Sequence, residues 1–200
     1  GRSHTRYCFR NHNVEVDDGI EFEITNISHI REEDEYENFR VNLIAEFGKI
    51  KNDMKIDITT GDAITPKEME YLYPCMFQNE SIRVLAYPLE TILAEKYESV
   101  IKRNISTTRM RDFYDLYNLY NLRKEEIDFD ILKQAIISTA NRRGSFPLMK
   151  QAMEIIKDIK EDDYLKELWK VYLADNLYVG DLDFLETVKI VEIIADKIAL

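Results

Sequence analysis

Cysteine, histidine and glycine are scarce in this sequence: its 200 residues include two Cys, three His and six Gly. Cys8 and Cys75 are too few and too far apart for a disulfide framework, and no Cys/His spacing matches a zinc site. The histidines, His4, His12 and His29, all precede the part of the chain with a helical pattern, so we do not expect histidine-based catalysis. A Gly-rich phosphate loop and a GxSxG turn are also absent from the sequence. The residues left to carry chemistry are carboxylates and lysines.

Long apolar runs are missing too, since no stretch approaches the roughly twenty apolar residues that a membrane span needs. No secretory signal is recognisable either, and together with the few cysteines this predicts a cytoplasmic protein with no membrane partner. The formal net charge of −11 repels polyphosphate backbones and disfavours nonspecific binding to duplexes. Any contact with nucleic acid must therefore be local. Hydrophobic residues make up 45% of the chain, which is enough for one sizeable core.

Alternating apolar and polar residues predict three neighbouring strands in the first part of the chain. The predicted strands are residues 20–25, 41–47 and 54–58, with turn residues at 48–53. We expect the strands to pair antiparallel, each with one half-buried face. The stretch from Thr60 to about Arg83, which contains Pro66 and Pro74, reads mostly as loop.

Beyond that loop the apolar spacing changes to three and four residues, which is typical of helices. Pro88 suits a first helical position, that helix should run to about Asn104, and Ser106, Thr107 or Thr108 can cap the next helix. Further helices are predicted at residues 130–142, 148–159, 163–177 and 183–198. The fold class is therefore α+β, a small mixed or antiparallel sheet followed by a helical bundle. The predicted domains are residues 1–83, with the sheet, and residues 84–200, with the helices.

The strand at residues 54–58 carries the first candidate site. Its alternation puts Lys55 and Asp57 on one face and Met54, Ile56 and Ile58 on the other. A carboxylate at this position can bind Mg²⁺, which prefers oxygen ligands, although one carboxylate makes an incomplete site. The alternative is a solvent-facing pair of Lys55 with Asp57.

The first helix carries the second candidate, Lys96, which falls inside the apolar stripe formed by Leu89, Ile92, Leu93 and Val100. A lysine at such a position must extend its ammonium to the rim, pair with an anion or bind a ligand. A lysine beside a cleft can also hold a triphosphate. The spacing leaves both interpretations open.

The next helix contains Arg109 and Asp112, with Arg111 and Asp115 beside them, at spacings of three and four residues. Intrahelical ion pairs explain this pattern, but they stabilise a helix by only about 0.2–0.5 kcal/mol each. Four charges among aromatic residues equally indicate a functional face. The tyrosines at positions 114, 117 and 120 could stack on a base, but the last two share the apolar stripe and are more simply core.

Four segments form a series along the chain, namely residues 55–62, 87–96, 109–117 and 142–144. The third, with its Arg-x-Arg-Asp-x-x-Asp-Leu pattern, is the most specific. In order and spacing the series resembles the AbiEii/AbiGii toxin nucleotidyltransferase family. The resemblance implies a polymerase-β-like nucleotidyltransferase fold for the sheet, with a helical domain behind it.

The resemblance also implies roles for single residues. Asp57 matches a sheet carboxylate that binds the metal, and Lys96 matches the lysine that grips the nucleotide. Asp112 matches the essential aspartate of the fourth motif, so that Asp57, Lys96 and Asp112 form the expected catalytic set. Lys55 and Arg109 are expected to contact the nucleotide together with Lys96.

Members of this family are toxins of bacterial toxin–antitoxin or phage-defence systems. The resemblance implies that the protein transfers a nucleotide from an NTP, with GTP as one candidate, to an RNA acceptor such as tRNA. It also implies that the protein uses Mg²⁺ and pairs with a cognate antitoxin protein. The first family motif, a Gly-Ser or Gly-Gly turn followed by an Asp-x-Asp strand, is not found upstream of Ile20, and Asp17-Asp18 does not match it. Because phosphoryl transfer depends on metal charge, the chain as given is expected to be inactive alone.

The alternative is a noncatalytic relative that binds an antitoxin or another subunit through its acidic helical half. The enzymatic interpretation depends on one spatial prediction, that Asp57, Lys96 and Asp112 converge on one pocket.

Overall fold

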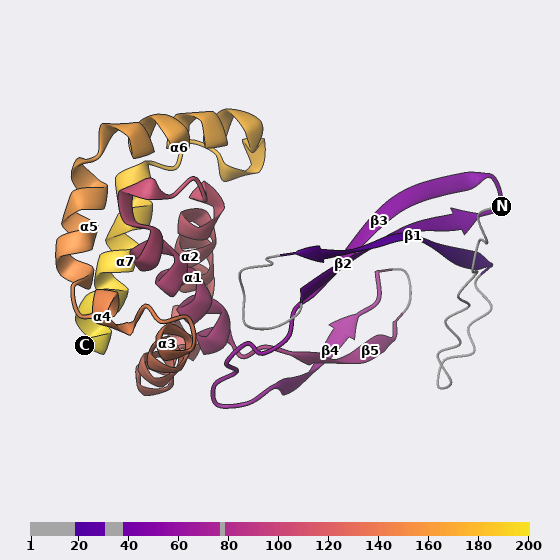
Figure 1. The fold of residues 1–200 in the computed structure, drawn as a ribbon, viewed down its shortest axis with the longest axis horizontal. Coiled ribbons are helices and arrows are strands. Elements are labelled where there is room, and N and C mark those ends of the chain that lie inside the picture. The colour runs from indigo at the N-terminus through magenta and orange to yellow at the C-terminus, as the bar shows by residue number, and fades with distance from the viewer. Residues whose placement is uncertain (1–18, 31–37, 77–78) are drawn as a thin grey trace. The chain divides into compact units, whose positions relative to one another are not determined.

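The computed structural model describes residues 19–30, 38–76 and 79–200, so Cys8, His4, His12 and the Asp17-Asp18 pair lie outside the described residues. The chain divides into two compact units, residues 1–62 and 63–200, and each is described by itself (Figure 1). The first unit contains a three-stranded sheet and the second contains a hairpin and the helices. The predicted α+β class is confirmed.

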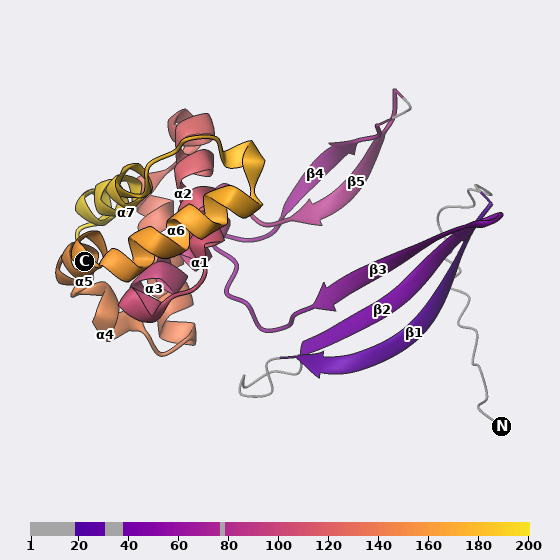
Figure 2. The same ribbon diagram turned by 90° about the horizontal axis from the view of Figure 1, so that it is seen from above.

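The sheet of the first unit consists of β1 (Ile20–Ile30), β2 (Asn38–Phe47) and β3 (Ile50–Ile58) in the order β1-β2-β3. Both pairings are antiparallel, as the sequence predicted (Figure 2). The turn between β2 and β3 is shorter than expected, because Phe47 already pairs with Ile50. Gly48 has a φ of 59°, the positive value that glycine supplies at the first position of a two-residue hairpin turn.

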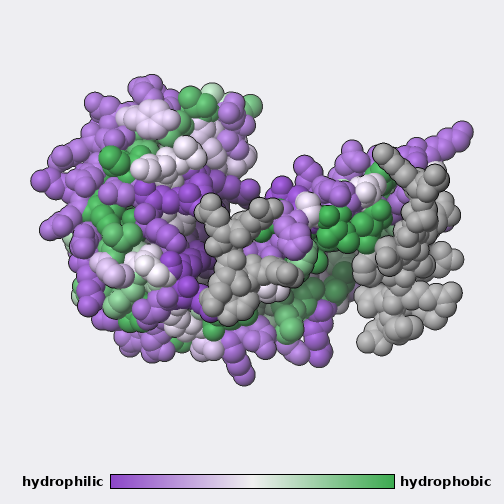
Figure 3. Space-filling model, viewed as in Figure 1, coloured by the Kyte–Doolittle hydropathy of each residue, from purple (hydrophilic) through white to green (hydrophobic). Residues whose placement is uncertain are grey.

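One face of this sheet is apolar, and we call it the apolar sheet face. Its aliphatic and aromatic members are Ile20, Phe22, Ile24, Ile27, Phe39, Val41, Leu43, Ala45, Phe47, Ile50, Met54, Ile56 and Ile58. A bulge between Ile24 and Asn26 adds one residue to β1 and so keeps Ile27 on this face. The expected half-burial was wrong for β3, whose residues are all exposed, because the described part of this unit contains no helix to cover the strands. Figure 3 shows hydrophobic residues at the surface over this sheet.

A second hairpin, β4 (Met69–Pro74) and β5 (Ser81–Ala86), occupies part of the stretch expected to be loop. The prediction was wrong here because Pro74 was read as a breaker, whereas it stands at the end of β4, opposite Ser81, where a proline is tolerated. The hairpin belongs to the same compact unit as the helices. The domain boundary expected after Arg83 stays a prediction.

Seven helices follow the hairpin in the described part of the chain. They are α1 (Leu89–Arg103), α2 (Met110–Arg123), α3 (Phe129–Arg142), α4 (Phe146–Met149), α5 (Ala152–Glu161), α6 (Asp163–Asp175) and α7 (Phe184–Ile198). Aspartates cap the N-termini of three of these helices, α3, α6 and α7. The side chains of Asp128, Asp162 and Asp183, respectively, accept hydrogen bonds from backbone N–H groups in the first turns. The helix predicted at 148–159 is in fact α4 and α5. Within the described ranges no helix is both long and apolar enough to span a bilayer.

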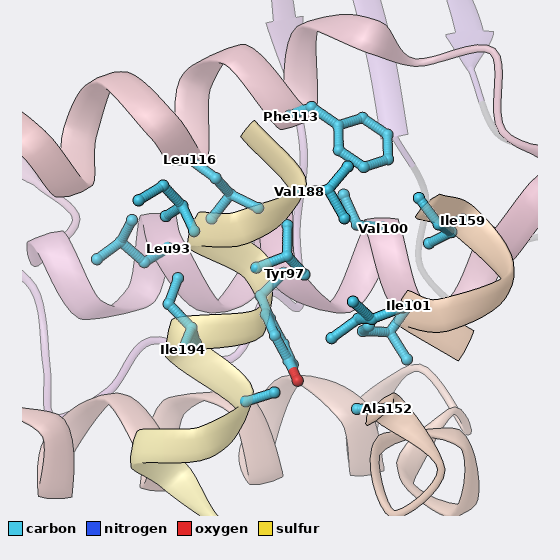
Figure 4. Packing of buried hydrophobic residues seen from close by; sticks show 14 of the residues in the cluster. Leu93, Tyr97, Val100, Ile101, Phe113, Leu116, Ala152, Ile159, Val188 and Ile194 are labelled. Atoms are coloured by element: carbon cyan, nitrogen blue, oxygen red, sulfur yellow. The ribbon is translucent and has the colours of Figure 1, made fainter. Parts of the chain in front are cut away.

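The helices share one core, into which α1 inserts Leu93, Tyr97 and Ile101. Figure 4 shows these side chains in one cluster with Leu116 of α2 and Ile194 of α7. The apolar residues whose spacing predicted this helix therefore form the buried face of α1. Because α1 and α2 both lie on this core, the polar residues at their edges are held in fixed relation to each other.

Candidate functional site

Lys96 forms the centre of a charged cluster between α1 and α2. Its Nζ lies 3.2 Å from Oδ1 of Asp112 and 2.7 Å from Oδ2 of Asp115. The Lys96 side chain is 23% exposed, so the lysine pairs with anions at the rim of the core while part of it stays accessible. Spacing along the sequence could not reveal this contact, because the two helices meet only through tertiary packing.

Asp112 is the most buried charged group of the cluster, with 2% of its surface exposed. Ser99 donates its hydroxyl to Oδ2 at 3.0 Å, and Arg109 donates from Nη2 to Oδ1 at 3.3 Å. Nε of Arg109 also forms an ion pair with Oδ2 at 2.8 Å. Together with Lys96, these donors satisfy both carboxylate oxygens, as a buried charge requires. Sequence reasoning missed Ser99, although its position three residues after Lys96 puts both on one side of α1.

An open pocket of about 390 Å³ lies over this cluster. Its lining consists of Lys96, Thr108, Arg109, Met110, Arg111, Asp112, Asp115 and Tyr172. Three of these side chains are cationic and two are anionic, so the pocket has a local positive excess in a chain whose net charge is −11. The volume falls within the roughly 300–1,000 Å³ of small-molecule sites. Cations at a pocket of this size can bind phosphate groups.

The predicted site residues of the sheet, Lys55 and Asp57, lie in the other unit. The alternative interpretation paired Asp57 with Lys55, but the side chain that holds the carboxylate of Asp57 is another one. Arg40 on the neighbouring strand β2 donates to Asp57 from Nε at 2.7 Å and from Nη2 at 2.8 Å. This bidentate pair forms because Arg40 and Asp57 are direct cross-strand partners, while Lys55 lies opposite Asn42.

A resident divalent metal needs several ligands that converge on one point. No group of three His, Cys, Asp or Glu side chains among the described residues could hold a metal ion. Asp57 is one carboxylate whose two oxygens already accept from Arg40. A resident metal centre therefore does not fit the described residues. The convergence of Asp57 with Lys96 and Asp112 stays a prediction, whereas Lys96, Arg109 and Asp112 do lie together.

A second buried charge fixes the helix that carries Lys96. Glu98 is 1% exposed and accepts from Nη1 of Arg143 at 2.9 Å and from the hydroxyl of Ser145 at 2.6 Å. Arg143 also lies 3.4 Å from Glu95. Arg143 therefore ties the end of α3 to the turn of α1 that contains Lys96.

Comparison with protein families identifies the family of the chain. The family model described as "Nucleotidyl transferase AbiEii toxin, Type IV TA system" matches residues 8–198. The chain belongs to the AbiEii family. Neither the search of curated proteins nor the search of solved structures finds a match. AbiEii membership confirms the resemblance and supports a nucleotidyltransferase-like role in a toxin–antitoxin system, with a nucleotide substrate and an antitoxin partner.

Proposed function

We propose that this AbiEii-family chain binds an NTP together with its Mg²⁺ in the pocket over Lys96 and that, once an Asp-x-Asp motif completes the metal site, the nucleotide is transferred to an RNA acceptor, with a tRNA 3′ end as the expected acceptor and GTP as one candidate donor. The observation that carries the proposal is the juxtaposition of Lys96 and Arg109 around the buried Asp112. In the reaction, the acceptor hydroxyl oxygen bonds to the α-phosphorus, the bond to pyrophosphate breaks, and the hydroxyl proton is released.

The proposed role of Lys96 and Arg109 is to bind the triphosphate. Their charged groups both contact the carboxylate of Asp112, at 3.2 Å and 2.8 Å from its oxygens, and both residues line the pocket. Cations held in place before the substrate arrives stabilise phosphate charge more than mobile ones do, because little reorganisation is needed.

The proposed role of Asp112 is to orient these two cations. Both of its oxygens accept hydrogen bonds from Lys96, Arg109 and Ser99, and its buried position favours positioning over proton abstraction. Its match to the family's essential aspartate is consistent with this role. A carboxylate that fixes two phosphate-binding cations is needed for activity even when it never touches the reacting atoms.

Lys55 and Asp57 complete the proposal, as a nucleotide contact and as a ligand of the metal that accompanies the NTP. The two hydrogen bonds that Asp57 accepts from Arg40 compete with such a contact. This part of the proposal is supported by the family resemblance alone.

A transfer assay tests the proposal. Full-length protein is incubated with each labelled NTP, Mg²⁺ and bulk RNA, and label in the RNA is measured. We expect labelling that is lost in Lys96→Ala and Asp112→Ala and retained in the matched controls Lys157→Ala and Asp130→Ala, which change exposed residues of α5 and α3. Equal labelling by Asp112→Ala and by the unaltered protein would reject the role given to Asp112.

A noncatalytic interaction module is the second candidate, and the apolar sheet face favours it. Phe47, Ile50 and Ile56 are 55%, 68% and 47% exposed, and clustered exposed hydrophobic residues commonly mark protein interfaces. The two candidates differ in nucleotide binding. In thermal melts, NTP with Mg²⁺ raises the midpoint if nucleotide binds, and the Lys96→Ala variant should lose that shift if the pocket is the site.

A further inference from the structure

The pocket over Lys96 has one aromatic wall that neither the family motifs nor the proposed roles include. Tyr172, on α6, lines the pocket together with Lys96, Arg109 and Asp115. Its hydroxyl lies 3.2 Å from the hydroxyl of Tyr178, in the 3₁₀ turn η3 (Leu177–Val179) that follows α6. The sequence could not reveal this wall, because Tyr172 follows α2 by about fifty residues and joins the pocket only in the folded chain.

The Tyr172 ring is held in place by other aromatic rings. Its centroid lies 5.3 Å from that of Trp169 and 6.5 Å from that of Tyr114, and Tyr114 in turn contacts Tyr178 edge-on at 5.6 Å. Trp169 is itself fixed, since its indole N–H donates to the backbone oxygen of Leu182 at 2.7 Å. Packing of this kind holds the half-buried ring of Tyr172 before any ligand arrives.

The ring is also close to the charged part of the pocket and remains neutral there. Burial, followed by the hydrogen bond to Tyr178, raises the pKa of the Tyr172 phenol, and the charge of Asp115 raises it further. Asp115 lies 2.7 Å from the ammonium of Lys96. An uncharged aromatic surface thus adjoins the cations, which is the combination that a nucleotide, with a flat base and an anionic tail, requires.

We propose that Tyr172, supported by Tyr178, is the base-contacting wall of the pocket and stacks on the base of the nucleotide whose phosphates bind Lys96 and Arg109. This inference rests on the proposed function, because it takes the cations as the phosphate subsite. Stacking on a tyrosine tolerates any base, so the wall contributes affinity and orientation more than choice of base.

Calorimetric titration with two kinds of probe tests the inference. One kind is the Mg²⁺ complex of each of the four NTPs. The other is the Mg²⁺ complex of inorganic tripolyphosphate, which has the anionic tail and no base. Tyr172→Leu keeps apolar bulk against Trp169 and removes the aromatic ring, whereas Tyr172→Phe keeps the ring. Tyr164→Leu, at the exposed start of the same helix and outside the pocket lining, is the matched control.

We expect Tyr172→Leu to weaken NTP binding by at least about 5-fold, the low end of what base–aromatic stacking contributes. Tripolyphosphate should bind this variant as it binds the unaltered protein. Tyr172→Phe and Tyr164→Leu should bind both probes like the unaltered protein.

Three results would overturn the inference, and they separate it from the proposed function. If Tyr172→Leu binds NTPs normally while Lys96→Ala does not, the phosphate subsite is supported and base stacking on Tyr172 is refuted. If neither kind of probe binds the unaltered protein, both the proposed function and the stacking on Tyr172 are refuted. If Tyr172→Leu weakens a short single-stranded RNA and leaves NTP binding intact, the ring contacts the acceptor's base instead of the donor's.

Discussion

Replacing Asp112 by asparagine removes the charge at the centre of the cluster while keeping the shape of the side chain. In the folded protein this carboxylate accepts from Lys96, Arg109 and Ser99. The asparagine amide has one acceptor oxygen and one NH₂ group, so one of the two cations faces a donor where it had an acceptor. We therefore expect Asp112→Asn to destabilise the helical unit.

The magnitude of this loss follows from the contacts. Hydrogen bonds to charged groups contribute about 1.5–3 kcal/mol and neutral ones about 0.5–1.5 kcal/mol, so each converted bond costs about 1 kcal/mol. Two considerations reduce the total: the side chain of Arg109 is 47% exposed, and Lys96 retains Asp115. The free energy of unfolding should fall by about 2–3 kcal/mol, which for a chain of this length lowers Tm by roughly 4–12 °C.

Urea unfolding followed by circular dichroism measures the change, with Tm from calorimetry as a second reading. The matched control is Asp130→Asn, which alters an exposed aspartate in the first turn of α3, as Asp112 is in the first turn of α2. The control should stay within about 0.5 kcal/mol of the unaltered protein. If Asp112→Asn also stays within that range, the carboxylate does not hold the two cations and the reasoning is refuted.

Three further substitutions test other contacts. Glu98→Gln should lower the free energy of unfolding by about 2–4 kcal/mol, because Arg143 loses a buried anionic partner, and an unchanged urea midpoint would contradict that role. Tyr97→Phe should raise the free energy of unfolding by about 1 kcal/mol, because the buried Tyr97 hydroxyl has no hydrogen-bond partner among the described residues. A loss of stability in this variant would show that the hydroxyl does have a hydrogen-bond partner. In metal-free buffer, Arg40→Ala should leave Tm unchanged, because the ion pair of Arg40 with Asp57 is exposed. A clear drop in Tm would show that this ion pair stabilises the sheet.

Much of the fold follows from local patterns in the sequence. The period-two alternation predicted β1, β2 and β3, and the three- and four-residue spacing of Leu93, Tyr97 and Val100 predicted α1, whose burial the structure confirms. The hairpin β4-β5 was missed although Met69, Tyr71 and Tyr73 alternate, because two prolines in the same stretch suggested a loop. A closer count of that alternation would have found it.

The candidate site was less predictable, since it depends on packing between segments distant in the chain. Lys96 and Asp112 were identified singly, but their contact requires α1 and α2 to dock on one core. Arg40 was not predicted as the partner of Asp57, because that requires the register of β2 against β3, which turn length sets. Tyr172 comes from a third helix and has no local signal of its own.

The most direct test of the central claim, that the pocket over Lys96 is a nucleotide site, is titration of the purified protein with the Mg²⁺ complex of each NTP, starting with GTP. The account predicts that the unaltered protein and Lys157→Ala bind alike, and that Lys96→Ala binds at least about 10-fold more weakly, the low end for loss of a hydrogen bond between a cation and a phosphate. Undiminished binding of every NTP by a folded Lys96→Ala protein would contradict it.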